Sequence, residues 1–154
     1  MEQTKKLSWI LVRPELLLFC KDDLESFLRE KGFSISCKKK ISRLSDLSVK
    51  LYTNATPALS ALYKSLFSQL FGKYAETAEI WYLESKSNST LLEQFSSLNE
   101  IKKQFRKLNW KYDIAIMVEY NEEETQYGYS YFHVPDPCEE EVARESNLVE
   151  QYIT

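Results

Sequence analysis

The only histidine of the 154-residue chain, His133, lies in the segment 130–145, which reads SYFHVPDPCEEEVARE. Imidazole titrates near neutral pH and can do chemistry there, although most single histidines have structural roles. The surrounding sequence places His133 at the end of a predicted strand and just before a predicted helix, where α/β proteins often bind anions. His133 is therefore either a group that acts on a bound anion or a ring that fills space.

The residues after His133 predict where that helix begins. Asp136 is a favourable N-cap, and Pro137 suits the first helical position, where no backbone N–H is needed. Glu139 stands three residues after the cap, as in a capping box, and the acidic run 139–141 suits the positive end of a helix dipole. We therefore predict a helix that begins at Pro137, with Asp136 as its cap rather than as a catalytic group. Its predicted apolar face consists of Val142, Val149, Tyr152 and Ile153.

The other polar side chains that could do chemistry give weaker signals. Arg13 ends an apolar run, and a contact with phosphate is as compatible with its position as simple solvation of a strand end. The lysines at 38–40 are typical of a solvated strand end. The acidic run 121–124 is typical of a turn, because catalytic carboxylates need burial to shift their pKa. Three widely spaced cysteines without a second histidine predict no metal site and indicate reduced, cytosolic thiols.

The length and composition fit one soluble domain over residues 1–154. Hydrophobic residues make up 44% of the chain and charged residues 28%, as in ordinary globular proteins. The net charge of −3 gives no general attraction to nucleic acids or to anionic membranes. The N-terminal apolar run is interrupted by Arg13 and Pro14, which is unlike a signal peptide or a membrane span. We therefore predict a cytoplasmic protein that binds neither nucleic acid nor membranes.

Hydrophobic periodicity predicts alternating strands and helices along the chain. Apolar residues three or four apart predict helices at 15–31, ended by Gly32, and at 43–52, 57–72 and 91–108. Continuous or alternating apolar residues predict strands at 8–12, 33–41, 78–85, 112–120 and 126–134. The first strand is expected to be buried on both faces, and the last two are expected to form a hairpin. This order predicts an α/β (α+β) sandwich of ferredoxin-like βαββαβ type, with extra helices and one extra strand pair.

The order of the motifs resembles that of the nucleoside diphosphate kinase family. The stretch WILVRPE at 9–15, followed by a helix, KGF and a strand, resembles the opening of that family, in which a strand ends in V-K-P-D. LSVKLY at 47–52 resembles the helix that carries a substrate-facing tyrosine, and SYFHVPDP at 130–137 resembles the family's N-x-x-H-G-S-D-S. The resemblance covers almost the whole chain, and its weight lies in the order of motifs that are individually weak.

The resemblance implies a nucleotide-binding phosphotransferase, a kinase that works through a phosphohistidine. His133 would take a phosphate from a nucleoside triphosphate and pass it to a diphosphate, which suits a neutral imidazole near pH 7. Tyr52 would face the nucleotide. Arg13 would stand in place of the family's lysine, so that a planar guanidinium group replaces an ammonium group. Mg²⁺ would accompany the bound nucleotide and shield its phosphates. Because the family forms hexamers and tetramers built from dimers, a homo-oligomer is also expected.

Several positions depart from the family pattern around His133. Ser130 stands where the family has asparagine, and Val134 and Pro135 replace glycine and serine. The family's R-G-D-F stretch, whose arginine binds phosphate, has no recognisable copy. The basic residues nearest its place are Arg106, Lys107 and Lys111. Since such groups supply most of the rate in phosphoryl transfer, we expect nucleotide binding with weak or absent transfer through His133.

Two alternative functions fit the same sequence. The chain could be a catalytically inactive assembly or protein-interaction module with the kinase fold, in which His133 is a relic. It could also be an unrelated ferredoxin-like binding domain, if the order of motifs is coincidental. The nucleotide hypothesis predicts that Arg13 lies on the same side of the sheet as His133, because a bound phosphate needs convergent cations. At least one further cation should join them from the set Lys102, Lys103, Arg106, Lys107 and Lys111.

Overall fold

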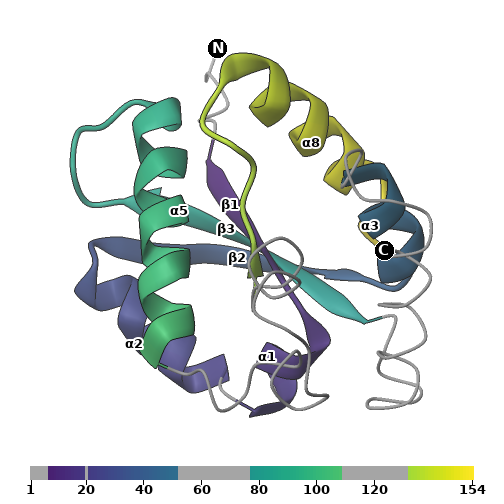
Figure 1. The fold of residues 1–154 in the computed structure, drawn as a ribbon, viewed down its shortest axis with the longest axis horizontal. Coiled ribbons are helices and arrows are strands. Elements are labelled where there is room, and N and C mark those ends of the chain that lie inside the picture. Colours follow the sequence, from purple (N-terminus) through teal and green to yellow (C-terminus); the bar gives the residue numbers. More distant parts are fainter. Residues whose placement is uncertain (1–6, 20, 52–76, 109–131) are drawn as a thin grey trace.

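A computed structural model of the protein describes residues 7–19, 21–51, 77–108 and 132–154. The helices and strands in these ranges are shown in Figure 1: β1 (Ser8–Val12), α1 (Pro14–Phe19), α2 (Lys21–Glu30), β2 (Phe33–Ile41), α3 (Leu44–Leu51), β3 (Ala78–Ser85), α5 (Leu91–Leu108), β4 (Phe132–His133) and α8 (Glu139–Gln151). The predicted helix at 57–72, the strand at 112–120 and most of the strand at 126–134 lie outside the described residues. The hairpin between those two strands therefore stays a prediction.

No helix within the described ranges combines the length and the hydropathy of a membrane-spanning segment.

The strands form one antiparallel sheet in the order β2-β3-β1-β4. β1 lies between β3 and the short strand β4, which pairs with it through Leu11↔His133 and Val12↔Phe132. The connection from β1 to β2 through α1 and α2 leaves room for β3 between them, as in a split βαβ arrangement. The predicted sandwich with an antiparallel sheet is confirmed, and its strand order is compatible with the ferredoxin-like plan.

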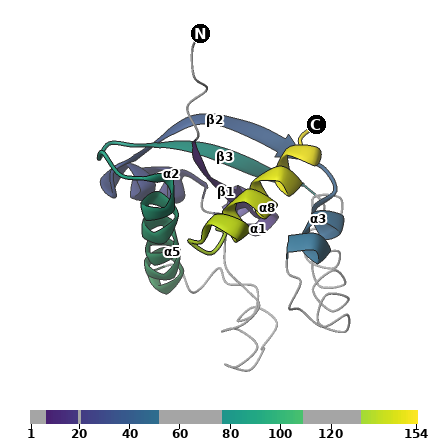
Figure 2. The ribbon, with the colours of Figure 1, turned by 90° about the horizontal axis from the view of Figure 1, so that it is seen from above.

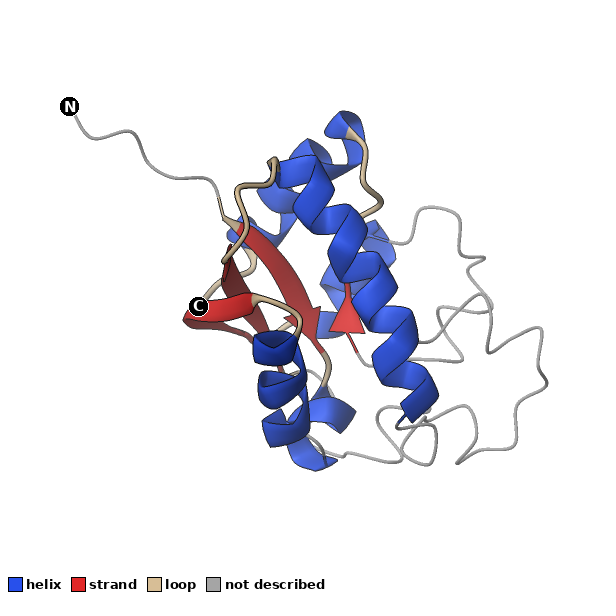
Figure 3. Ribbon diagram, turned by 90° about the vertical axis from the view of Figure 1, so that its left-hand side faces the viewer, coloured by secondary structure: helices blue, strands red, loops and turns tan. Residues whose placement is uncertain are grey.

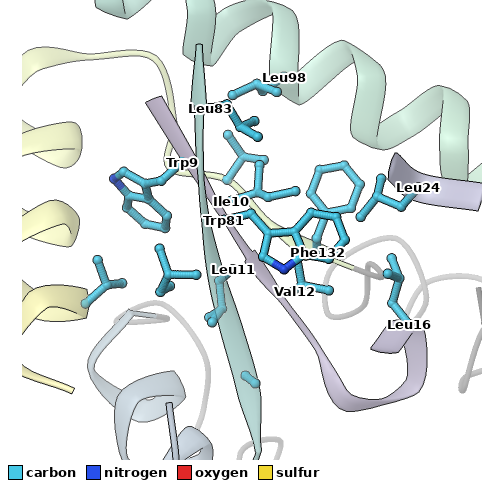
Figure 4. Packing of buried hydrophobic residues seen from close by; sticks show 14 of the residues in the cluster. Trp9, Ile10, Leu11, Val12, Leu16, Leu24, Trp81, Leu83, Leu98 and Phe132 are labelled. Atoms are coloured by element: carbon cyan, nitrogen blue, oxygen red, sulfur yellow. The ribbon is translucent and has the colours of Figure 1, made fainter. Parts of the chain in front are cut away.

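Helices cover both faces of the sheet (Figure 3). Every residue of β1 is buried. Ser8 donates a hydrogen bond from its hydroxyl to Oε1 of Gln94 in α5, at 2.9 Å. The indole N–H of Trp9 donates instead to the hydroxyl of Ser146 in α8, also at 2.9 Å. Successive side chains of a strand point to opposite faces, and Figure 4 shows Trp9 toward α8 and Ile10 on the opposite side. The nearly all-apolar sequence of β1 is explained by this burial, as predicted.

The helices pack in two pairs, α2 with α5 and α3 with α8 (Figure 2). Aromatic rings join the first pair to the sheet. The ring of Phe105 in α5 lies 5.6 Å from that of Phe27 in α2 and 6.3 Å from that of Phe132 in β4, measured between centroids. These contacts fix α5 against the strand that ends in His133.

Local sequence signals determine where α2 ends and where α5 begins. α2 ends where Gly32 adopts a φ of 89°, a left-handed conformation that glycine adopts without strain. α5 begins with a capping box, because the backbone N–H of Glu93 donates to the Thr90 hydroxyl and the Thr90 N–H donates to the Glu93 carboxylate. The hydrogen bond from the Thr90 backbone N–H to the Glu93 carboxylate is the main cause that lowers the pKa of Glu93. The prediction that Gly32 ends a helix is confirmed. The predicted helix at 15–31 differs, because the structure describes two helices there, α1 and α2.

The beginning of α8 differs from the prediction. The helix starts at Glu139, and its N-cap is Cys138, which makes no side-chain capping hydrogen bond. The backbone N–H of Cys138 donates to the carbonyl of Asp136 at 2.8 Å, so a tight turn at Pro137 delays the helix by two residues. Asp136 is therefore exposed and too far back in the chain to cap the helix. Its predicted role as N-cap, and that of Pro137 as the first helical residue, are wrong.

Candidate functional site

His133 ends β4, and its side chain faces α8. It is buried, with 9% of its surface exposed. Its Nε2 atom is hydrogen-bonded to Oε1 of Glu145, and its ring centroid lies 6.5 Å from that of Trp9. His133 therefore lies between the sheet and the α8 layer, on the same face as Trp9.

Glu145 reaches His133 because of its position in α8. Val142 and Val149 are buried three residues before it and four after it, so the three side chains lie along one face of the helix. Glu145 is only 3% exposed, and a buried carboxylate is costly unless it has a partner. Sequence reasoning named the two valines and missed Glu145. A charged residue on the apolar stripe of a predicted helix is the signal that could have identified it.

Arg13 follows the last residue of β1 and is 3% exposed. Leu11 pairs with His133, and side chains two residues apart on a strand point to the same face. Arg13 thus lies on the same side of the sheet as His133, close enough for its charge to contribute to lowering the pKa of that imidazole. It is a buried cation and not a solvated strand end.

The cation that α5 contributes beside them is Lys102. Its ammonium group donates to Oδ1 of Asn99 at 3.3 Å. Burial lowers the pKa of Lys102, and the charge of Arg13 lowers it further, while Asp136 opposes the shift. The next residue, Lys103, is 72% exposed and pairs with Glu100 at the helix surface. Of these two neighbouring lysines, only Lys102 joins Arg13 near His133.

The other residues named from the sequence are not placed by the structure. Tyr52 and Lys111 lie outside the described residues. Arg106 and Lys107 belong to the last turn of α5, but the described part of the chain does not include their side chains. Their proposed contacts with nucleotide phosphates therefore stay predictions.

Burial is the main influence on the protonation of His133 and lowers its pKa below the ordinary value for histidine. The hydrogen bond and the charge of Glu145 oppose this shift, whereas Lys102 and Arg13 add to it. The imidazole is therefore neutral at pH 7. With the Nε2 proton donated to Glu145, Nδ1 is the nitrogen that carries the lone pair.

This shift makes stability depend on pH in a defined window. We expect the free energy of unfolding to fall as the pH is lowered through about 6.5, the unfolded pKa of histidine, toward the lower folded value, because the unfolded chain binds the proton first. Urea unfolding at a series of pH values measures this dependence, and His133→Gln should remove that part of it. The imidazole gives a single histidine signal in NMR, and a titration midpoint above that of a model peptide would contradict the assignment.

Arg144 connects this site to the α3 layer. Its guanidinium donates to the backbone carbonyls of Lys50 at 3.0 Å and Leu51 at 3.3 Å, at the C-terminal end of α3. It also donates to Glu141 at 2.8 Å and lies 3.9 Å from Oε2 of Glu145. Arg144 thereby links α8 to the C-terminal end of α3 and lies near the carboxylate that binds His133.

The described donor set suits an anion better than a metal ion. The charges of the Arg13 guanidinium and the Lys102 ammonium group both lower the pKa of the His133 imidazole, and cations of this kind bind phosphate or carboxylate. Within the described ranges, no three His, Cys, Asp or Glu side chains lie together as metal ligands would. The described cysteines Cys37 and Cys138 are free and exposed.

No protein-family model matches this chain, and neither a curated protein nor a solved structure shows significant similarity to it.

Proposed function

We propose that the protein binds the phosphate groups of a nucleoside di- or triphosphate beside His133 and transfers phosphate slowly or not at all. The observation that supports this proposal is that two cations, Arg13 and Lys102, both act electrostatically on the imidazole of His133. Arg13 comes from the end of β1 and Lys102 from α5, and the charge of each acts on His133. Convergent cations provide the charge-assisted hydrogen bonds that hold phosphate oxygens.

The Glu145 carboxylate would give His133 the tautomer that nucleophilic attack requires. A carboxylate that accepts the proton of one ring nitrogen orients the ring and increases the electron density at the other. In the transfer step, Nδ1 would form a bond to the terminal phosphorus while the bond from that phosphorus to the leaving diphosphate oxygen breaks. Arg13 and Lys102 would orient the phosphate oxygens. Mg²⁺ would enter with the nucleotide, held mainly by its phosphates, and would shield their charge.

The same geometry supports slow transfer. His133 is 9% exposed, and both Val134 and Pro135 behind it are buried. A nucleophile contributes little when the approach of the phosphoryl group and its electrostatic stabilisation are incomplete, because these carry most of the rate. Binding should therefore be easier to detect than turnover.

Nucleotide binding is tested by a pair of neighbouring lysines. Lys102→Met should weaken the binding of Mg²⁺-ATP by roughly 10-fold or more, since a charge-assisted hydrogen bond contributes about 1.5–3 kcal/mol. Lys103→Met removes the same charge from the exposed surface and should leave the affinity close to that of the wild type. Isothermal titration calorimetry measures all three proteins. Equal losses in the two variants, or no loss in Lys102→Met, would refute the site.

Transfer through His133 is tested with ATP labelled at the γ-phosphate. Label on the protein that is lost in acid and retained in base indicates phosphohistidine, and His133→Gln should abolish it while keeping a side chain that can donate to Glu145. We expect labelling that is slow compared with mixing. Rapid exchange of phosphate between nucleotides would show that the site is fully active and that the expectation of weak transfer is wrong.

The burial of His133 also supports a second function, that of a non-catalytic module. The hydrogen bond to Glu145 and the contact with Trp9 are those of a structural histidine. In that case the protein would neither bind nucleotide nor become labelled, and its fold would serve assembly or protein interaction. Homo-oligomer formation stays a prediction, which light scattering over a range of concentrations tests.

A further inference from the structure

Asn99, on α5, makes three hydrogen bonds with its side-chain amide. Nδ2 donates to the backbone carbonyl of Phe95 at 2.9 Å and to that of Pro135 at 3.0 Å. Oδ1 accepts from the ammonium group of Lys102 at 3.3 Å. Carbonyl oxygens only accept and an ammonium group only donates, so these partners determine the orientation of the amide.

The amide therefore joins two parts of the candidate site that come from different segments. Pro135 lies two residues after His133, in the connection between β4 and α8. Lys102 is three residues after Asn99 and thus on the same face of α5. A single side chain therefore contacts both the backbone two residues after His133 and the ammonium group of Lys102.

We propose that Asn99 is a positioning residue of this site, which fixes the Lys102 ammonium and the backbone at Pro135 so that a condensed phosphate held by Lys102 lies beside His133. This inference rests on the proposed function. Asn99 need not touch the ligand, because it acts through the two groups that it holds. Its contribution should therefore be visible in the properties of Lys102 even without a ligand.

Two substitutions of Asn99 separate positioning from simple packing. Asn99→Asp keeps the shape and the acceptor for Lys102 but adds a negative charge, so the pKa of Lys102 should rise. Asn99→Ala removes the acceptor, so that pKa should fall. Asn147 is an exposed residue of α8, and Asn147→Asp provides the same charge change away from the site. Competitive acetylation of the folded proteins over a range of pH, read by mass spectrometry, gives the pKa of Lys102 in each.

Binding of inorganic pyrophosphate is the second measurement. Asn99→Asp should weaken it roughly 10-fold, since the new carboxylate offsets the positive charge of Lys102 toward an anion and cannot donate to the Pro135 carbonyl. Asn99→Ala should weaken it less. Asn147→Asp should bind as the wild type does.

The two measurements can fail independently. If the wild type binds neither pyrophosphate nor nucleotide, the proposed function is wrong. Opposite shifts of the Lys102 pKa in the two Asn99 variants would still support the positioning of Lys102 by Asn99. If the pKa of Lys102 moves in the same direction in both Asn99 variants, or moves no more than in Asn147→Asp, the positioning role is refuted. Circular dichroism checks that each variant is folded. If Asn99→Ala does not fold, the comparison of the isosteric Asn99→Asp with Asn147→Asp still tests the proposal.

Discussion

Replacing His133 by alanine is expected to lower the free energy of unfolding by about 3–5 kcal/mol at neutral pH, the usual cost of removing one member of a buried pair. Glu145 is 3% exposed and would lose the hydrogen bond from Nε2. Its other oxygen lies 3.9 Å from Arg144, which is partly exposed and too distant to replace that bond. Urea unfolding followed by tryptophan fluorescence measures the loss.

The double variant His133→Leu/Glu145→Leu is the matched control. Two apolar side chains of suitable volume remove the uncompensated carboxylate along with its partner, and such replacements of buried pairs are often neutral or stabilising. The double variant should therefore be more stable than His133→Ala, and the pair should show a favourable coupling energy in a double-mutant cycle. Additive losses would mean that the two side chains do not depend on each other.

Trp9→Ala is expected to destabilise the protein by a similar amount, about 3–5 kcal/mol, because it leaves a large cavity in the core. The side chain is 1% exposed and meets the ring of Phe95 edge to face, with centroids 6.0 Å apart. Its N–H also binds Ser146, so the cavity opens where β1, α5 and α8 meet. The same urea experiment gives the change in free energy.

Two further variants show whether packing explains that loss. Trp9→Phe keeps a ring and loses the hydrogen bond to Ser146, which costs about 1 kcal/mol in addition to a smaller cavity. Leu18 is 47% exposed, and Leu18→Ala should change the stability by less than about 0.5 kcal/mol. If Trp9→Ala costs no more than Leu18→Ala, Trp9 is not part of the core as described.

Elements with a strong local signal could be predicted from the sequence. The nearly all-apolar run of β1 indicated burial on both faces. Gly32 marked the end of a helix because it supplies the left-handed conformation found there. The long amphipathic pattern of α5 gave that helix the bounds 91–108, as observed. In each case the determining interactions lie within a few residues of one another, so periodicity and helix-end chemistry are sufficient.

The candidate site could be predicted only in part, because its contacts join distant segments. The alternation of side chains along β1 and the pairing Leu11↔His133 place Arg13 on the same face of the sheet as His133. Neither segment alone determines how the two strands pair. Glu145 and Asn99 were missed, since each acquires its role from a partner on another element. Asp136 had the composition of a helix cap, but the turn from Asp136 to Cys138 displaced the helix start.

The central position of β1 has a consequence for how the chain folds during synthesis. β1 is synthesised before its partners β3 and β4, which begin at residues 78 and 132, and Ser146, which binds Trp9, comes later still. Closing such long loops is entropically costly, and sheets made of distant pairs fold slowly. Until residue 78 has emerged, the apolar strand SWILV has no partner among the strands described here. Between the emergence of β1 and that of β3, the nascent chain therefore exposes an apolar segment of the kind that chaperones bind.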